Sequence, residues 1–222
     1  MTRHLLKSLA LVALLALPAT SCAPVYARPP GPPPPPPSVA TDISLFYTQL
    51  EPYGHWFVLG SYGWVWTPYD MPPGWRPYLT GHWVYSTYGW TWVADEPWGW
   101  APFHYGRWLY DDDFGWVWVP DTVWGPAWVC WRQGPGFVGW APLPPGVAWS
   151  AGGGLDLGSV QVSLFSWSFV PDRWFLDRRM HRHVHPFPRN VTYHRRSSPV
   201  GGGTIFEGRP ANRGLDVQDL ER

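Results

Sequence analysis

A short pattern of Trp, Gly and other aromatic residues recurs along this chain and restricts what it can fold into. Trp-x-Trp triplets occur at Trp64–Trp66, Trp90–Trp92 and Trp116–Trp118, each preceded by an aromatic residue and a Gly. The two indoles of a triplet stand at i and i+2, so they share one face of a β-strand. A further Trp precedes each triplet, at Trp56, Trp83 and Trp108. The pattern therefore predicts a series of Trp-rich β-hairpins.

The spacing of the repeats predicts how these hairpins are stabilised. The glycines that open successive copies, Gly54, Gly81 and Gly106, lie 27 and 25 residues apart, and each copy holds one hairpin. An isolated hairpin is barely stable in water, because it buries too little apolar surface. We therefore expect the copies to pack on one another, Trp against Trp.

Composition divides the chain into regions. Its 28 Pro and 24 Gly in 222 residues would suggest disorder, but 17 of the 19 Trp lie between Trp56 and Trp149. We predict an all-β domain of packed short antiparallel hairpins over residues 41–176, with its main block at 53–145. A short helix capped by Asp42 is expected near its start. The basic segment 177–222 is expected to be largely disordered.

The N-terminal residues 1–22 have the features of an export signal. A basic start precedes the apolar stretch Leu9–Leu17, which is too short to span a bilayer stably. Residues 19–22 resemble a lipobox, in which Cys22 would be acylated and would anchor the mature chain to a membrane. The alternative is ordinary cleavage after Ala27, which would give a secreted protein. Both interpretations predict export.

Residues 23–40 form a Pro-rich segment that includes six consecutive prolines, Pro32–Pro37. Such a tract adopts extended polyproline II and acts as a semi-rigid spacer. Together with an acylated Cys22 it would hold the domain away from a membrane. The expected location is the periplasm or the outer membrane, the latter through a lipid anchor.

Charge is unevenly distributed although the net charge is zero. Residues 43–150 contain eight acidic side chains against three Arg, whereas residues 157–200 contain seven Arg against two Asp. In an exported protein, a basic segment of this kind is expected to meet anionic polymers or lipid head groups rather than nucleic acid. The expected partners are therefore envelope glycan or anionic lipid head groups, with no nucleic acid.

Several longer motifs follow one another in a fixed order. They are Gly81–Trp83, Tyr88–Trp92, Glu96–Pro102, His104–Trp108, Gly115–Pro120, Trp124–Val129 and Gly139–Pro145. Together they resemble an uncharacterised family of bacterial Trp/Gly-rich exported proteins, some of which carry a FecR-like domain. The resemblance covers Tyr53 to Val191. It implies a bacterial envelope location and no known activity.

The Trp triplets have two interpretations. Indoles on an exposed strand face would offer a stacking platform for sugar rings, and the candidates are Trp64, Trp66, Trp90, Trp92, Trp116 and Trp118. Alternatively, the same indoles form the core of small sheets. The core is favoured, because an exposed apolar patch of that size would aggregate or require a partner.

Three alternating histidines are the only metal-site candidates that the sequence suggests. His181, His183 and His185 would share a face of an extended segment and could hold zinc or copper. The many Arg around them favour a solvated cationic strip instead. We therefore expect neither a metal ion nor a cofactor.

No catalytic motif is recognisable, and no residue is predicted to be catalytic. Cys130 lies between Val129 and Trp131 at strand spacing, which is typical of a small apolar filler. The sequence therefore predicts a non-catalytic exported cell-envelope protein with a structural or interaction role. The alternative is a carbohydrate- or peptidoglycan-binding module that uses exposed Trp rows.

Overall fold

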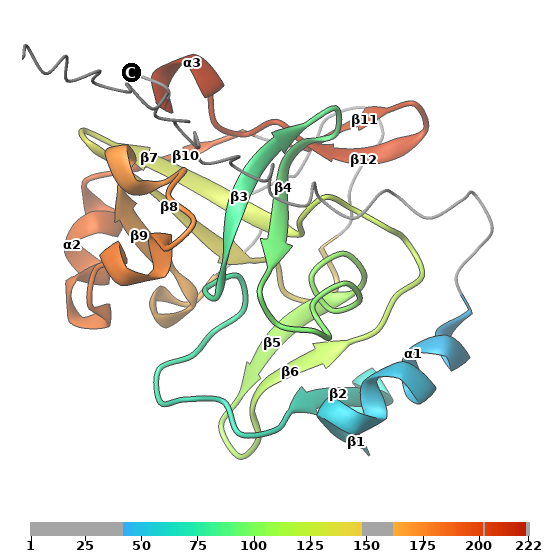
Figure 1. Cartoon of the computed structure of the whole chain (residues 1–222). Coiled ribbons are helices and arrows are strands. Elements are labelled where there is room, and N and C mark those ends of the chain that lie inside the picture. Colours follow the sequence, from blue (N-terminus) through green and yellow to red (C-terminus); the bar gives the residue numbers. More distant parts are fainter. Residues whose placement is uncertain (1–41, 148–161, 202, 221–222) are drawn as a thin grey trace, which may run out of the picture. The chain divides into compact units, whose positions relative to one another are not determined.

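Strands dominate the computed structural model, which describes residues 42–147, 162–201 and 203–220, all within the unit Gly31–Arg222. The predicted export signal, Cys22 and the Pro-rich spacer lie outside the described residues. The strands are β1 (Gly54–Val58), β2 (Trp64–Pro68), β3 (Gly81–Ser86), β4 (Gly89–Ala94), β5 (Arg107–Asp111), β6 (Gly115–Val119), β7 (Val129–Gly134), β8 (Phe137–Pro142), β9 (Ser168–Pro171), β10 (Ser198–Val200), β11 (Gly203–Phe206) and β12 (Arg209–Asn212). They form sheets of order β1-β2-β6-β5, β10-β7-β8-β9 and β11-β12-β4-β3 (Figure 1). The predicted all-β class is confirmed.

Four antiparallel hairpins carry the Trp repeat: β1–β2, β3–β4, β5–β6 and β7–β8. In each of them one Trp faces another across the two strands, in the pairs Trp56–Trp66, Trp83–Trp92, Trp108–Trp118 and Trp131–Trp140. The first three hairpins are those that the triplets predict, and the fourth repeats the pairing without a triplet. Trp66 also faces Trp118, which joins two hairpins into one sheet. A cross-strand Trp pair is thus the stabilising unit of every copy.

The indoles form the core of the fold. The rings of Trp66, Trp83, Trp90, Trp92, Trp108, Trp118, Trp131 and Trp140 are among the largest fully buried side chains. Trp83 links two sheets, because its ring centroid lies 4.9 Å from that of Trp92 and 4.7 Å from that of Trp131. Several indole N–H groups donate to backbone carbonyls, as Trp118 Nε1 does to Tyr105 O at 2.7 Å. Because the N–H group is hydrogen-bonded, the indole can be buried at little cost in free energy.

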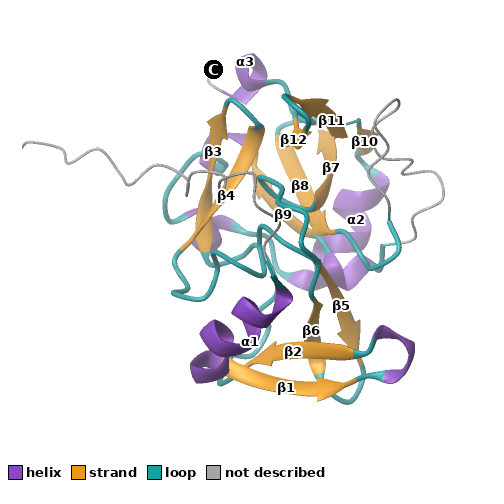
Figure 2. Cartoon of the chain, turned by 90° about the vertical axis from the view of Figure 1, so that its right-hand side faces the viewer, coloured by secondary structure: helices purple, strands orange, loops and turns teal. Residues whose placement is uncertain are grey.

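The helix expected near the start of the domain is present as α1 (Ile43–Leu50). Asp42 caps it, since its side chain accepts from the backbone N–H of Ser44 at 2.9 Å. Phe46 is fully buried and lies edge-on to Trp118 at 5.3 Å. Figure 2 shows α1 beside the β1–β2 hairpin. The helix therefore covers the Trp pairs of the first sheet.

The expected disorder of residues 177–222 is wrong for the described ones. Two helices, α2 (Asn190–Arg195) and α3 (Val217–Leu220), lie there, β10 pairs with β7, and β12 runs parallel to β4. The described part of 177–222 is ordered because it completes two sheets and supplies acceptors for buried indoles, neither of which is visible in its composition.

Short 3-10 helices connect the main elements. They occur at Glu51–Tyr53, Gly60–Tyr62, Leu164–Ser166, Asp172–Trp174, Met180–His183 and Phe187–Arg189.

Candidate functional site

A cavity of about 530 Å³ with mainly aromatic walls is the best candidate for a binding site. It is lined by Gly74, Trp75, Arg76, Tyr110, Asp112, Trp116, Phe165 and Phe187. We call it the aromatic cavity. Its walls come from the β2–β3 connection, from β5, β6 and the loop between them, and from two of the short 3-10 helices. Cavities of this size accept a small molecule or one end of a chain.

The rings of the aromatic cavity form a fixed floor and an exposed rim. Trp75 and Trp116 are each 8% exposed, whereas Tyr110 and Phe187 are 45% and 50% exposed. Tyr110 lies edge-on to Trp116 at 5.6 Å and to Phe165 at 4.5 Å. Because Tyr110, Trp116 and Phe165 pack on one another, these three rings would lose little conformational entropy when a ligand binds.

Trp75 is oriented by a hydrogen bond from behind. Its Nε1 donates to Glu96 Oε1 at 3.1 Å, and its ring lies edge-on to Trp108 at 5.8 Å. The backbone of Trp116 is held by Thr67, whose Oγ1 donates to the carbonyl oxygen of Trp116 at 3.0 Å. Both Trp residues are therefore held by hydrogen bonds to residues outside the cavity lining.

Arg76 brings a cation into the aromatic cavity. The side chain is 9% exposed, and its Nε donates to Ser168 Oγ at 2.6 Å. Burial alone lowers the pKa of Arg76 to about 10, with no contribution from a neighbouring carboxylate. The guanidinium is still charged at neutral pH. Asp112 stands in the exposed β5–β6 loop at the edge of the cavity.

The six Trp residues considered for sugar stacking do not form an exposed platform. Five of them are buried: Trp66, Trp90, Trp92, Trp116 and Trp118. Only Trp64, which is 52% exposed, offers its ring to solvent. The indoles of the triplets are covered by other hairpins, by α1 and by the C-terminal segment, which corrects the hypothesis of exposed rows. Trp116 nevertheless lines the aromatic cavity.

Residues 47–147 match a family of unknown function (DUF6600). No curated protein and no solved structure matches the chain. The matched segment contains the four Trp hairpins and therefore agrees with the resemblance to an uncharacterised family. It supplies Trp75, Arg76, Tyr110 and Trp116 to the aromatic cavity, whereas Phe165 and Phe187 come from beyond it.

The three histidines considered as metal ligands do not lie on one extended strand. His181 and His183 belong to a 3-10 helix, Met180–His183, and His185 follows it. His183 stacks on Trp174 and His185 stacks on Tyr193, each at 4.1 Å. Within the part of the chain that the structure describes, no group of three or more His, Cys, Asp or Glu could hold a metal ion.

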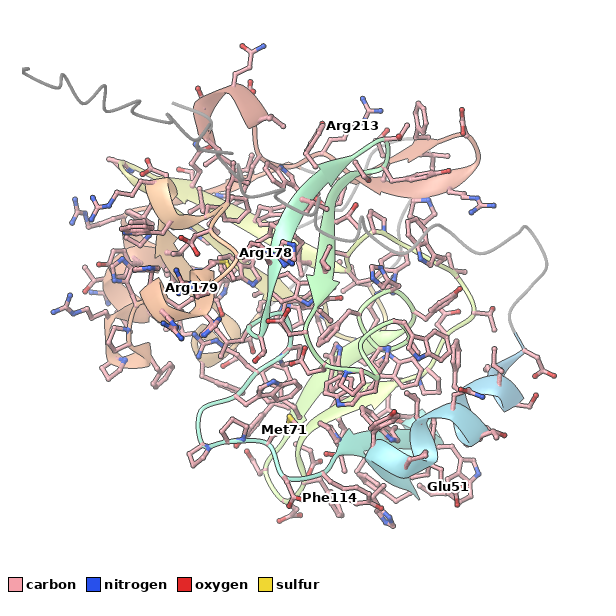
Figure 3. All side chains as sticks on the ribbon, viewed as in Figure 1. Glu51, Met71, Phe114, Arg178, Arg179 and Arg213 are labelled. Carbon is pink, nitrogen blue, oxygen red and sulfur yellow. The ribbon has the colours of Figure 1, made fainter. Side chains whose placement is uncertain are left out.

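Basic side chains of the C-terminal part of the chain lie at the surface. Arg178 and Arg179 are exposed, as is Arg213 further along the chain (Figure 3). Because these side chains are cationic and exposed, an interaction with anionic envelope components remains a prediction.

Three further ionisable groups, Cys130, His104 and Tyr78, are enclosed in the core. Burial raises the pKa of Cys130 to about 12, and its Sγ donates to Ala141 O at 3.6 Å. Burial lowers the pKa of His104 to about 4, and its Nδ1 lies 3.0 Å from Gly125 O. Tyr78 donates from its hydroxyl to Phe103 O at 3.0 Å. These groups bind backbone atoms and have a structural role.

Glu96 gives a testable dependence of stability on pH. Burial raises its pKa from 4.5 to about 7, an effect that the hydrogen bond from Trp75 partly offsets. Between these pH values the unfolded chain releases this proton and the folded chain keeps it, so the free energy of unfolding should fall as pH rises from 4.5 to 7. The loss attributable to Glu96 is at most roughly 3 kcal/mol. Urea unfolding at pH 5 and pH 8 measures it.

Glu96→Gln is the matched variant for this measurement. Glutamine keeps an oxygen that can accept from the Trp75 indole, but it has no proton to lose. The difference in stability between pH 5 and pH 8 should therefore be smaller in the variant by the contribution of Glu96. Equal pH profiles for the two proteins would contradict the assignment.

Trp75 and Arg76 belong to no motif that the sequence makes recognisable. Both lie in the β2–β3 connection, which is longer than the turns inside the hairpins. A long connection that carries a large aromatic residue and a cation is a signal of function, because such loops are placed by the scaffold rather than needed for it. Phe165 and Phe187 could not be found in this way, since only the fold brings them to the cavity.

Proposed function

We propose that the chain is a non-catalytic exported cell-envelope protein with an interaction role, and that it binds an envelope glycan in the aromatic cavity. The observation that carries this proposal is the pair of anchored indoles, Trp75 and Trp116, beside exposed rings at the rim. The C–H faces of sugar rings pack well on aromatic rings of this kind.

The composition of the cavity supports binding rather than hydrolysis. Among its lining residues the single carboxylate is that of Asp112, in an exposed loop. Glycosidases use two carboxylates on either side of the scissile bond. Glu96 lies behind the Trp75 indole and does not line the cavity. This arrangement supplies contact surface and two separate charges, those of Arg76 and Asp112, which suits a binding module.

The exported location is part of the proposal. It is supported by the predicted signal at residues 1–22, with Cys22 as the predicted lipidation site. None of the helices among the described residues has the length and hydropathy needed to cross a membrane. A lipid anchor at Cys22 followed by the Pro-rich spacer would place the aromatic cavity within reach of envelope glycans.

Tyr110→Ala is the variant that tests glycan binding. Its ring is 45% exposed at the rim, so its removal should cost little stability but should weaken binding roughly tenfold, or about 1.4 kcal/mol. Sedimentation of the full chain with insoluble peptidoglycan, followed by calorimetric titration with soluble fragments, measures the change.

Tyr85→Ala is the matched control. Tyr85 is 47% exposed and lies edge-on to Trp90 at 5.1 Å, in the same position of the preceding hairpin, but it does not line the aromatic cavity. It should bind glycan like the unmodified protein. Equal losses in both variants, or no saturable binding at all, would leave a purely structural role as the better hypothesis.

A further inference from the structure

Among the described residues, no carboxylate pairs with the charge of Arg76. Its side chain is 9% exposed, and the side-chain hydrogen bond that the structure gives it goes to a neutral hydroxyl, Ser168 Oγ. A buried cation is expensive unless an anion accompanies it. Burial lowers the pKa of Arg76, and no described carboxylate counters this effect. Within the described part of the chain, the aromatic cavity therefore presents a positive charge without an anionic partner.

The hydrogen bond to Ser168 fixes how this charge is presented. Ser168 lies in β9 and is 1% exposed, and its Oγ accepts a hydrogen bond from Arg76 Nε at 2.6 Å. Among the described residues, neither terminal nitrogen of the guanidinium has a hydrogen-bond partner. A guanidinium held in this way is suited to a carboxylate, which can accept from two of its N–H groups at once.

We propose that the aromatic cavity recognises an acidic sugar, whose ring packs on the aromatic walls while its carboxylate pairs with Arg76. This inference rests on the proposed glycan-binding function and adds the class of sugar. Asp112 at the exposed edge of the cavity would repel a second negative group. The cavity therefore suits a sugar with one carboxylate rather than a polyanion.

Two disaccharides that differ in one group test the proposal on the full chain. The first is N-acetylglucosaminyl-N-acetylmuramic acid, which carries a lactyl carboxylate, and the second is the neutral N,N′-diacetylchitobiose. We expect the acidic disaccharide to bind at least about tenfold more tightly in calorimetric titration, since a charge-assisted bidentate pair contributes this much. Esterifying its carboxylate with a methyl group should remove the preference without any change to the protein.

Arg76→Gln tests the same pair from the protein side. The variant should bind both disaccharides with the weaker affinity of the neutral one, while Arg76→Lys should keep part of the preference because it keeps the charge.

If the unmodified protein binds both disaccharides equally, the role of Arg76 is overturned and glycan binding stands. If it binds neither, both proposals fall. If free lactate binds as tightly as the acidic disaccharide, the sugar ring is not recognised and the inference is wrong.

Discussion

Replacing Gly106 with alanine is expected to lower the free energy of unfolding by roughly 3–5 kcal/mol. Gly106 is buried and has a φ of +64°, in the left-handed region that disfavours a side chain. A methyl group there would also overlap the carbonyl oxygen of Val119 and the indole of Trp118. Neither neighbour can move freely, because one is strand backbone and the other is a core ring. Urea unfolding followed by Trp fluorescence measures the loss.

Gly115→Ala separates the two parts of this cost. Gly115 has a similar φ of +73°, but nothing lies within 4 Å of the position that a methyl group would take. Its substitution should cost only the backbone strain, about 1–2 kcal/mol. If both variants lost the same stability, the overlap with Trp118 would contribute nothing and the argument for Gly106 would fail.

The same overlap explains why a glycine opens each repeat. A methyl group at Gly54 would meet the indole of Trp66, and one at Gly81 would meet that of Trp92. In these three hairpins the indole of a second-strand Trp packs against the glycine at or just before the start of the first strand. The repeat seen in the sequence therefore reflects one packing contact, between an indole and a glycine, that recurs in successive hairpins.

Local patterns were sufficient to predict the first three hairpins and α1. Hairpins follow from aromatic residues at i and i+2 on either side of a turn, and the α1 cap follows from Asp42 before an apolar helical stretch. The burial of most triplet indoles was also predictable, because an exposed surface of that kind would associate. These inferences need only neighbours in sequence.

Contacts between distant residues could not be predicted in this way. The aromatic cavity combines Arg76 with Ser168, which lies 92 positions later, and with Phe187 from a 3-10 helix. The basic composition after residue 177 suggested disorder, because charge and low apolar content are the usual signs of it. Strand pairing and a small number of polar contacts to buried indoles order this segment, and neither can be inferred from its composition.

Asn212→Ala is expected to lower the free energy of unfolding by roughly 3 kcal/mol. Asn212 is fully buried, and its Oδ1 accepts from Trp131 Nε1 at 2.6 Å. Its Nδ2 donates to Ala127 O at 3.3 Å and to Val129 O at 3.4 Å. Alanine would leave the indole N–H of Trp131 buried without an acceptor, which costs more than the hydrogen bond itself contributes.

Gln218→Ala is the control for this prediction, because Gln218 is exposed in the same segment and should change stability by less than about 0.5 kcal/mol. Trypsin provides a second measurement. Arg213 is exposed next to Asn212, so loosening of the segment should speed cleavage after Arg213 in Asn212→Ala, as identified by mass spectrometry. A loss below about 1 kcal/mol with unchanged cleavage would mean that the C-terminal segment is not held by Trp131, and the disorder predicted from its composition would be the better description.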